Sequence, residues 1–157
     1  MVEENGAGES PAQVVERLSL AKARAVRALR PDAAVLAADT VVAIGGRVLG
    51  KPRDRADAVG MLRSLSGATH EVWTGVTLIA GADETVFSVR TLVTFRELSD
   101  DEVGAYVDSG EPMDKAGAYA IQGGAAAFVS AIDGSWTNVV GLPVDETLSE
   151  LRRLCMV

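Results

Sequence analysis

The stretch LAADTVVAIGGRVLGKP, residues 36–52, combines a short apolar run with a tight turn, and the expected fold follows from it. Residues 33–38 are small and apolar, a pattern typical of a strand buried on both faces. Asp39 comes next, at the point where this strand is expected to stop. The glycines at 45–46 supply the positive φ angles that a hairpin turn needs, so the chain would return to Lys51. An acid and a lysine would then face each other across one cleft.

Such a pair suits phosphate chemistry. In an open α/β sheet the crevice beyond the strand ends holds the ligand, and Asp39 would point into it. There a carboxylate orients water or binds a divalent cation, while the Lys51 ammonium neutralises charge on phosphoryl oxygens. Two plainer interpretations stay open from these residues alone. The pair could lie on a surface hairpin, where it stabilises little, or Asp39 could be a buried acid held by backbone N–H groups.

Composition bounds the class of protein. With 157 residues, 48% of them hydrophobic, the chain is expected to form a single domain over residues 1–157. One cysteine, Cys155, and no secretory or long apolar segment predict a cytoplasmic protein. A net charge of −7 without basic runs argues against nucleic acid and anionic membranes as partners. An anionic substrate would need local cations, Lys22, Lys51 and Lys115, and would arrive with Mg²⁺.

Capping signals predict four helices. The first has Ser10 as N-cap, Pro11 at its first position and Gln13 completing a capping box. The third has the same box in the segment SDDE. The four helices are expected from Ser10 to Pro31, from Asp54 to Ser66, from Ser99 to Gly110, and from Pro143 onward.

Alternating apolar residues at 70–80 and 85–95 predict a long antiparallel hairpin. With the strand and helix before it, this hairpin would form a mixed sheet. The rest of the chain is expected to hold a loop at 111–116, strands at 119–122 and 125–132, and a turn-rich connection at 134–138. The first of these strands would deliver Gln122 to the cleft, while extended backbone would let only one of Asp114 and Lys115 face it.

Three separated segments, 36–52, DKAGAYAIQG at 114–123 and NVVGLP at 138–143, resemble the motifs of the Maf-like nucleoside triphosphate pyrophosphatases. They occur in the family's order, which is a stronger signal than any one of them. The resemblance implies an α/β fold with a mixed, elongated sheet flanked by helices and a cleft between two lobes. It also implies hydrolysis of dTTP, UTP or modified nucleotides between the α and β phosphates, giving the monophosphate and pyrophosphate.

The resemblance assigns water activation or metal binding to Asp39. Glu3 and Glu4 match an acidic pair of the family, and Glu4 would help to hold the metal, although glutamates near a chain terminus are more often solvent-exposed. His70 is the only histidine, so a site of several histidines is excluded. Carboxylate ligands favour Mg²⁺ or Mn²⁺ as the cofactor.

The resemblance also implies which residues contact the nucleotide. Lys51 matches the family's phosphate-contacting lysine, and Gln122 matches the glutamine of the subgroup that acts on dTTP and UTP. A glutamine has both a donor and an acceptor, which suits a pyrimidine edge. A lysine in the position of Lys22 is more often a solvent-exposed helix residue than a ligand contact. For Asp114, a structural role and a substrate-binding role are both possible. The expected substrate-binding residues are Lys22, Thr40, Lys51, Asp114 and Gln122.

The sequence departs from the family at its start. Family members begin with a strand and a Ser-x-Ser-Pro-Arg-Arg turn that binds the triphosphate, whereas this sequence begins at Met1 just before the acidic pair. The first strand and that turn are therefore expected to be missing, through a start placed too far downstream or in a shortened homologue. A shortened homologue suggests an alternative, a catalytically weak nucleotide-binding regulatory protein linked to cell division. A homodimer is plausible for the family.

A third reading is a phosphatase with an aspartate nucleophile, suggested by the Asp39-Thr40 pair. That chemistry normally needs a second aspartate two residues later, and position 41 is valine. The phosphatase reading is therefore set aside.

Overall fold

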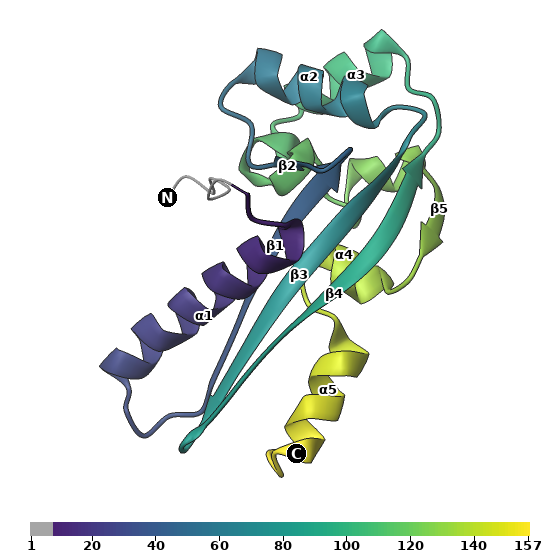
Figure 1. The fold of residues 1–157 in the computed structure, drawn as a ribbon. Helices are drawn as coiled ribbons and strands as arrows, with labels where there is room; N and C mark the ends of the chain where they lie inside the picture. The colour runs from purple at the N-terminus through teal and green to yellow at the C-terminus, as the bar shows by residue number, and fades with distance from the viewer. Residues whose placement is uncertain (1–7) are drawn as a thin grey trace.

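The computed structural model describes residues 8–157, which form one five-stranded sheet with helices around it (Figure 1). The strand order is β2-β1-β3-β4-β5. The elements are α1 (Pro11–Leu29), β1 (Val35–Ile44), β2 (Arg47–Leu49), α2 (Arg55–Leu65), β3 (Thr69–Ala80), β4 (Asp83–Phe95), α3 (Asp100–Asp108), the 3₁₀ turns η1 (Glu111–Asp114), η2 (Ala116–Ala118) and η3 (Gly124–Phe128), β5 (Val129–Asp133), α4 (Trp136–Val140) and α5 (Val144–Arg153).

The α/β class, with an elongated sheet flanked by helices, is confirmed. Figure 1 shows β1, β3 and β4 as a long arm, with α1 along it and α2 and α3 together at one end. The sheet itself differs from the mixed sheet expected, because each of its pairings in residues 8–157 is antiparallel. A parallel pair needs a crossover that returns the chain to the end where it started. Here α2 lies beyond the end of β1, so β3 runs straight back alongside it.

The predicted hairpin is confirmed. β1 and β2 pair from Val42 to Leu49 around Gly45 and Gly46, whose φ angles are 58° and 79°. Left-handed angles at both central residues give the turn whose twist matches that of the strands. The hairpin is short, because β2 pairs with β1 only over Val42–Ile44. Within the described residues, the edge of β1 before Val42 therefore has no neighbouring strand.

The predicted end of the first strand was wrong. β1 continues through Asp39, which pairs with Gly75 of β3 in the middle of the ladder. The expectation of burial on both faces was also wrong, since Ala34 and Leu36 are exposed. An antiparallel strand can leave part of one face in water, which a parallel strand covered by crossover helices cannot.

The four predicted helices are confirmed near their capping signals. Ser10 and Gln13 form the capping box of α1, and Ser99 and Glu102 form that of α3. The Asp54 side chain accepts the Asp57 N–H at the start of α2. These caps satisfy the first N–H groups of each helix from within a few residues of sequence.

The segment after α3 was predicted less well. Residues 119–122 are not a strand but enter a turn closed by a 3.1 Å hydrogen bond from the Gly123 N–H to the Ala120 carbonyl. The strand expected at 125–132 is shorter, because η3 occupies its first half and β5 begins at Val129. The loop expected at 111–116 contains η1, and the connection expected at 134–138 contains the start of α4. Contacts to distant parts of the chain fix these turns, so short-range patterns did not reveal them.

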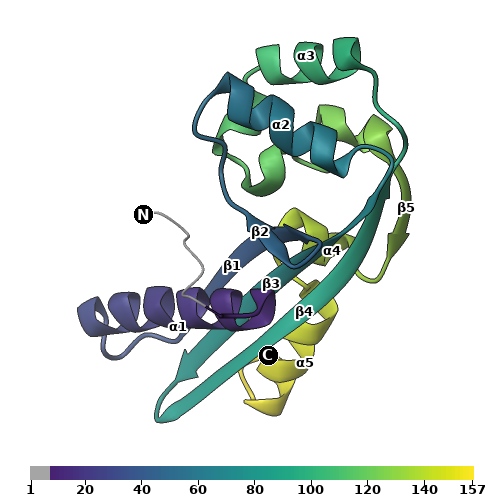
Figure 2. The ribbon, with the colours of Figure 1, turned by 45° about the horizontal axis from the view of Figure 1, so that its top comes forward.

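Helix α1 packs unusually close to the sheet at Gly75. A Cβ atom at that position would lie 2.2 Å from the Val15 carbonyl oxygen. Val14, Val15 and Leu18 of α1 are buried there against Val41 of β1. Figure 2 shows α1 lying across β1 and β3. The missing side chain of one glycine thus lets the helix backbone rest on the strand.

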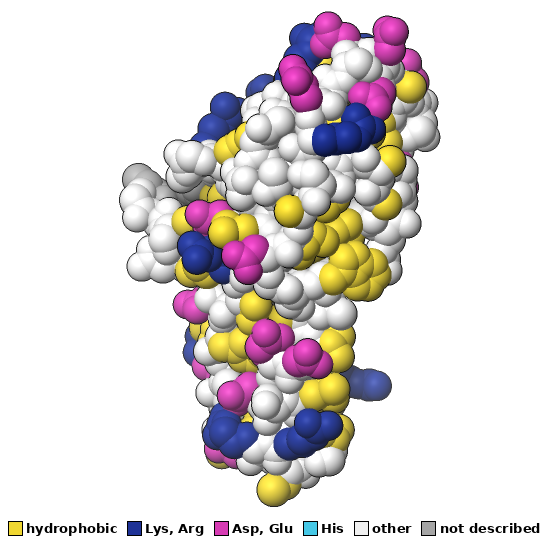
Figure 3. Space-filling view, turned by 90° about the vertical axis from the view of Figure 1, so that its right-hand side faces the viewer, with side chains coloured by type: hydrophobic (Ala, Val, Ile, Leu, Met, Phe, Trp, Pro, Cys, Tyr) yellow, Lys and Arg dark blue, Asp and Glu magenta, His cyan; other side chains and the backbone are white. Residues whose placement is uncertain are grey.

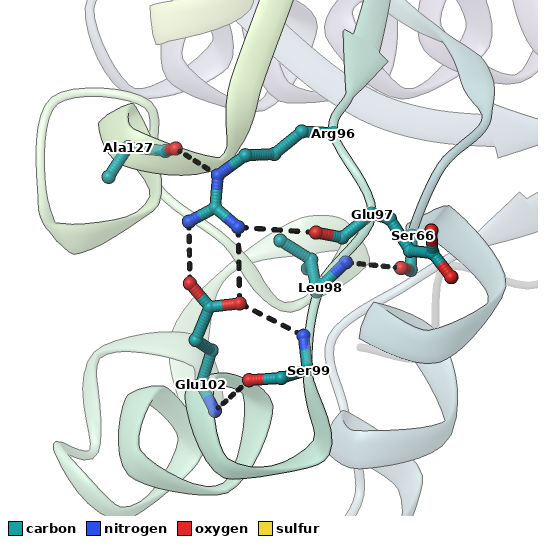
Figure 4. A network of polar contacts seen from close by, with 7 residues as sticks. All are labelled: Ser66, Arg96, Glu97, Leu98, Ser99, Glu102 and Ala127. Atoms are coloured by element: carbon teal, nitrogen blue, oxygen red, sulfur yellow. Dashed lines mark hydrogen bonds and ion pairs between the residues drawn. The ribbon is translucent and has the colours of Figure 1, made fainter.

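A network of polar contacts around Arg96 holds α3 against the segment before β5 (Figure 4). The Arg96 guanidinium donates to both carboxylate oxygens of Glu102, at 2.6 and 3.1 Å, and to the Ala127 carbonyl at 2.9 Å. The Arg96 N–H donates to the Phe128 carbonyl at 2.9 Å. One arginine at the end of β4 therefore fixes η3 and α3 in relation to each other.

The single histidine lies in the core rather than in the cleft. His70 is 1% exposed and its ring packs against those of Phe95 and Tyr119, with a 2.7 Å hydrogen bond between Nε2 and the Tyr119 hydroxyl. Burial lowers the pKa of His70 from 6.5 to about 4. A protonated ring would have to lose its hydration in this cluster, so the folded protein holds the neutral form.

We expect this histidine to make folding weaker in acid. Between pH 6.5 and 4 the unfolded chain binds a proton at His70 that the folded chain does not. The free energy of unfolding should therefore fall as pH drops through this window, by up to about 3 kcal/mol at its lower end. Urea unfolding at pH 7.5, 6.0 and 5.0 measures the effect.

The His70→Gln variant is the control, because it keeps a polar partner for the Tyr119 hydroxyl but does not titrate. Glu102, whose pKa the Arg96 hydrogen bond lowers to about 2, becomes protonated in the unfolded chain only near pH 4.5 and below. The effect of Glu102 on the free energy of unfolding therefore occurs mostly below pH 5.0, the lowest pH of the series. An equal acid dependence in the variant and the parent protein would show that His70 is not its source.

The surface of the protein carries a group of exposed hydrophobic side chains. Figure 3 shows hydrophobic side chains gathered on the face that carries α4 and α5, where Trp136, Val140 and Val144 are exposed. Among the helices of residues 8–157, none combines the length and apolar composition needed to cross a lipid bilayer.

Candidate active site

A cleft of about 310 Å³ lies where the open edge of β1 meets α1, the loop after β2, the segment after η1, and α4. The six described residues predicted for the site all line this cleft: Lys22, Asp39, Thr40, Lys51, Asp114 and Gln122. They come from four separate parts of the chain, and tertiary structure alone brings them together.

Asp39 is the buried acid of the cleft. It is 5% exposed and forms an ion pair through Oδ1 with the Lys22 ammonium. Its second oxygen, Oδ2, is buried without a hydrogen-bond partner among residues 8–157. A buried carboxylate oxygen is costly to leave unsatisfied. This oxygen is therefore available to a water, a cation or a substrate group.

The position of Lys22 follows from the close packing of α1. Val15, Leu18 and Lys22 follow one another at spacings of three and four and so share one face of the helix. Because Val15 rests on Gly75, and Gly75 pairs with Asp39, that face brings Lys22 to the carboxylate. Its side chain is 43% exposed and reaches the buried acid from the solvent side.

Thr40 points to the opposite face of β1 and is held by a chain of hydroxyl contacts. Its Oγ1 lies 2.8 Å from Thr74 Oγ1, which donates to the Asn138 carbonyl at 3.2 Å. Asn138 is fully buried, and its amide donates to the Val72 and Val89 carbonyls at 3.2 and 3.0 Å. The asparagine of the third motif thus ties α4 to the sheet behind Thr40.

Asp114 and Lys115 both line the cleft, although only one was expected to face it. Asp114 lies in a 3₁₀ turn rather than in extended backbone, so successive side chains do not point to opposite sides. Its carboxylate accepts a 2.7 Å hydrogen bond from the Lys115 ammonium. That bond, with a smaller contribution from Lys51, lowers the pKa of Asp114. The site therefore holds three lysines, since Lys22 and Lys51 also line it.

Gln122 lies exposed on the turn after Tyr119, and both residues line the cleft. Glu4, the predicted second metal ligand, lies outside the described residues. No group of three or more His, Cys, Asp or Glu side chains suited to a metal occurs within residues 8–157. In the described part of the site, Asp39 is thus the buried acid and Asp114 an exposed one.

Sequence reasoning did not find every residue of the cleft wall. Tyr119, Val139 and Val140 also line it. All three lie within the second and third motifs, DKAGAYAIQG and NVVGLP, so motif membership was the available signal.

Comparison with known proteins gives one family and many relatives. The family model described as Maf-like protein matches residues 1–154. A protein of Symbiobacterium thermophilum named dTTP/UTP pyrophosphatase is 54% identical over 143 residues, which cover 91% of this chain and 74% of that protein. Proteins of the same name from Myxococcus xanthus and Geobacter sulfurreducens are 54% and 51% identical, over 94% of this chain and 74% and 78% of those proteins.

Proposed function

The chain belongs to the Maf-like protein family, and from that premise we propose that it hydrolyses dTTP and UTP to the monophosphate and pyrophosphate. The names of its relatives support this substrate class. The observation that carries the proposal is the buried Asp39 carboxylate, held on one side by Lys22 and unsatisfied on the other, in a cleft with two further lysines.

The reaction proposed is attack of water on the α-phosphorus. The water oxygen bonds to that phosphorus, the bond from phosphorus to the α,β-bridging oxygen breaks, and pyrophosphate leaves. Asp39 Oδ2 takes the proton released by the water, acting as general base. Lys22 and Lys51 neutralise the charge that grows on the phosphate oxygens and on the leaving pyrophosphate. Thr40, whose hydroxyl is bonded to Thr74 in the absence of substrate, would turn that hydroxyl to donate to the phosphates.

A divalent cation, Mg²⁺ or Mn²⁺, would supply further neutralisation of the phosphates and make water a better nucleophile. Asp39 Oδ2, a buried carboxylate oxygen without a partner among residues 8–157, fits such an ion, and where it holds one it would orient the attacking water rather than take its proton. Glu4 is the second ligand that the sequence predicts. With few acidic side chains at the site, substrate phosphates and water would complete the coordination, as is usual for Mg²⁺.

Gln122 and Asp114 are proposed to bind the rest of the nucleotide. The Gln122 carboxamide can accept from N3–H and donate to O4 of uracil or thymine. Asp114, held by Lys115, lines the same side of the cleft. The single domain over residues 1–157, a homodimer and a cytoplasmic location stay predictions.

Product analysis tests the proposal. With Mg²⁺ present, dTTP and UTP should give equimolar monophosphate and pyrophosphate and no free phosphate. In ¹⁸O-labelled water the label should enter the monophosphate, because attack is at the α-phosphorus. Release of free phosphate and the diphosphate would instead indicate cleavage at the terminal phosphate. Tight binding of dTTP with background turnover would support the alternative, a regulatory nucleotide-binding protein.

A further inference from the structure

The turn that carries Gln122 is held from outside the cleft. The Ala120 N–H donates to the Tyr106 hydroxyl at 3.0 Å, and the Gly124 N–H donates to Glu111 Oε2 at 3.1 Å. Neither Tyr106 nor Glu111 lines the cleft. Both ends of the turn are therefore bonded to side chains behind it, and Gln122 projects from its middle.

The two side chains act as a unit. Tyr106 is 7% exposed, and burial and a hydrogen bond to Glu111 raise the pKa of its hydroxyl. The hydroxyl therefore keeps its proton and accepts from the Ala120 N–H, while Glu111 accepts from the Gly124 N–H at the other end of the turn.

The backbone of the turn packs closely against Tyr106 and Glu111. A Cβ atom on Gly123 would lie 1.7 Å from Glu111 Oε1, and one on Gly124 would lie 3.2 Å from the Tyr106 ring. The Gly123 φ angle is −105°, so the absence of a side chain there serves contact with Glu111 rather than backbone conformation. Two glycines thus let the turn approach the pair closely.

The supports of the turn are themselves braced. Arg96 joins Glu102 of α3, the helix that carries Tyr106, to Ala127 of η3, which begins at Gly124 (Figure 4). At the start of the turn, the Tyr119 hydroxyl is bonded to the buried His70 ring. Movement of Gln122 relative to β1 and Asp39 is therefore restricted.

We propose that Tyr106 and Glu111 are positioning residues that clamp the turn at 120–124, and that this clamp sets the selectivity of Gln122 for uracil and thymine over cytosine. The inference rests on the proposed function. Uracil and thymine present a donor at N3 and an acceptor at O4, whereas cytosine presents the reverse. A carboxamide free to rotate satisfies either pattern, because it carries one donor and one acceptor group. Selectivity thus requires that the rest of the cleft favour one orientation of the carboxamide, which it can do only when the backbone of Gln122 is held at one place in the cleft.

Loss of the clamp should weaken binding and selectivity more than catalysis. In the Tyr106→Phe variant, KM for dTTP should rise about tenfold, the worth of one or two hydrogen bonds, with kcat changed less than about twofold. The preference for dTTP over CTP should fall by a similar factor. Gly123→Ala, which forces Glu111 away, should give the same pattern from the other end of the turn.

A double-mutant cycle separates the clamp from a general structural effect. If Tyr106 acts through Gln122, the Tyr106→Phe change should have little further effect in a Gln122→Ala background. Val107→Ala is the matched control, since Val107 is a buried neighbour on the same helix that does not line the cleft. It should lower stability and leave the dTTP to CTP ratio unchanged. Additive effects of Tyr106→Phe and Gln122→Ala, or a ratio unmoved in both Tyr106→Phe and Gly123→Ala, would overturn the clamp.

Equilibrium binding keeps this test independent of turnover. Calorimetric titration with the α,β-methylene analogues of dTTP and CTP should show the same loss of preference in the variants. Selective binding by the parent protein without hydrolysis of dTTP would overturn the proposed reaction but not the clamp. Absence of any binding to the parent protein would overturn both.

Discussion

Replacing Asp39 with asparagine is expected to lower kcat for dTTP by about 1,000-fold, the scale of a lost general base. The amide has the same shape but cannot take a proton from water, and it does not balance the charge of Lys22 or of a cation. Steady-state pyrophosphate release at several Mg²⁺ concentrations measures the loss. High Mg²⁺ should not restore activity, because the missing group is the carboxylate itself.

The protein should remain folded in this variant. Asp39 is buried with one oxygen unsatisfied, and a neutral amide costs less to bury than a charge. The free energy of unfolding should therefore stay the same or rise. Asp114→Asn is the matched control, because it removes an exposed acid from the same cleft and should cost less than about tenfold in kcat. If Asp39→Asn retained activity close to that of Asp114→Asn, Asp39 would not be the base.

Replacing Gly75 with alanine is expected to destabilise the protein by about 3 kcal/mol, the upper part of the usual range for overpacking. The added Cβ would lie 2.2 Å from the Val15 carbonyl oxygen and 2.4 Å from its carbon. Both are backbone atoms, so no side chain can swing away, and α1 must shift from the sheet. Urea unfolding followed by far-UV circular dichroism measures the change.

The same substitution should impair the cleft. Lys22 reaches Asp39 only because α1 lies on Gly75, so a displaced helix weakens the ion pair and raises KM for dTTP. Gly60→Ala is the control, since a Cβ there would meet no atom within 4 Å and Gly60 lies within α2. It should stabilise the protein by about 0.5–1 kcal/mol through helix propensity. A Gly75→Ala protein as stable as its parent would contradict the close packing of α1.

Local sequence was sufficient for most elements. The capping boxes at Ser10 and Ser99 act over three residues, and the turn at Gly45-Gly46 depends on the φ angles of its own two residues. The alternation in β3 and β4 also repeats over short distances. Such signals survive in a sequence because the interactions behind them join near neighbours. The motifs likewise pointed to five of the six residues that the structure brings into one cleft, all except Lys22.

Long-range contacts decided the remainder. The turn that carries Gln122 is set by Tyr106 and Glu111, each 13 or 14 residues from its partner, and Asn138 bonds the Val72 carbonyl 66 residues away. Asp39 lies within a strand rather than at its end because β3 pairs with β1 on both sides of Asp39. The sequence by itself thus indicated the site residues and most of the helices and turns that carry them. Two tertiary contacts bring these residues into one cleft: the packing of α1 on Gly75 and the antiparallel pairing of β3 with β1. Each contact joins segments that are distant along the chain, so no short-range pattern encodes it.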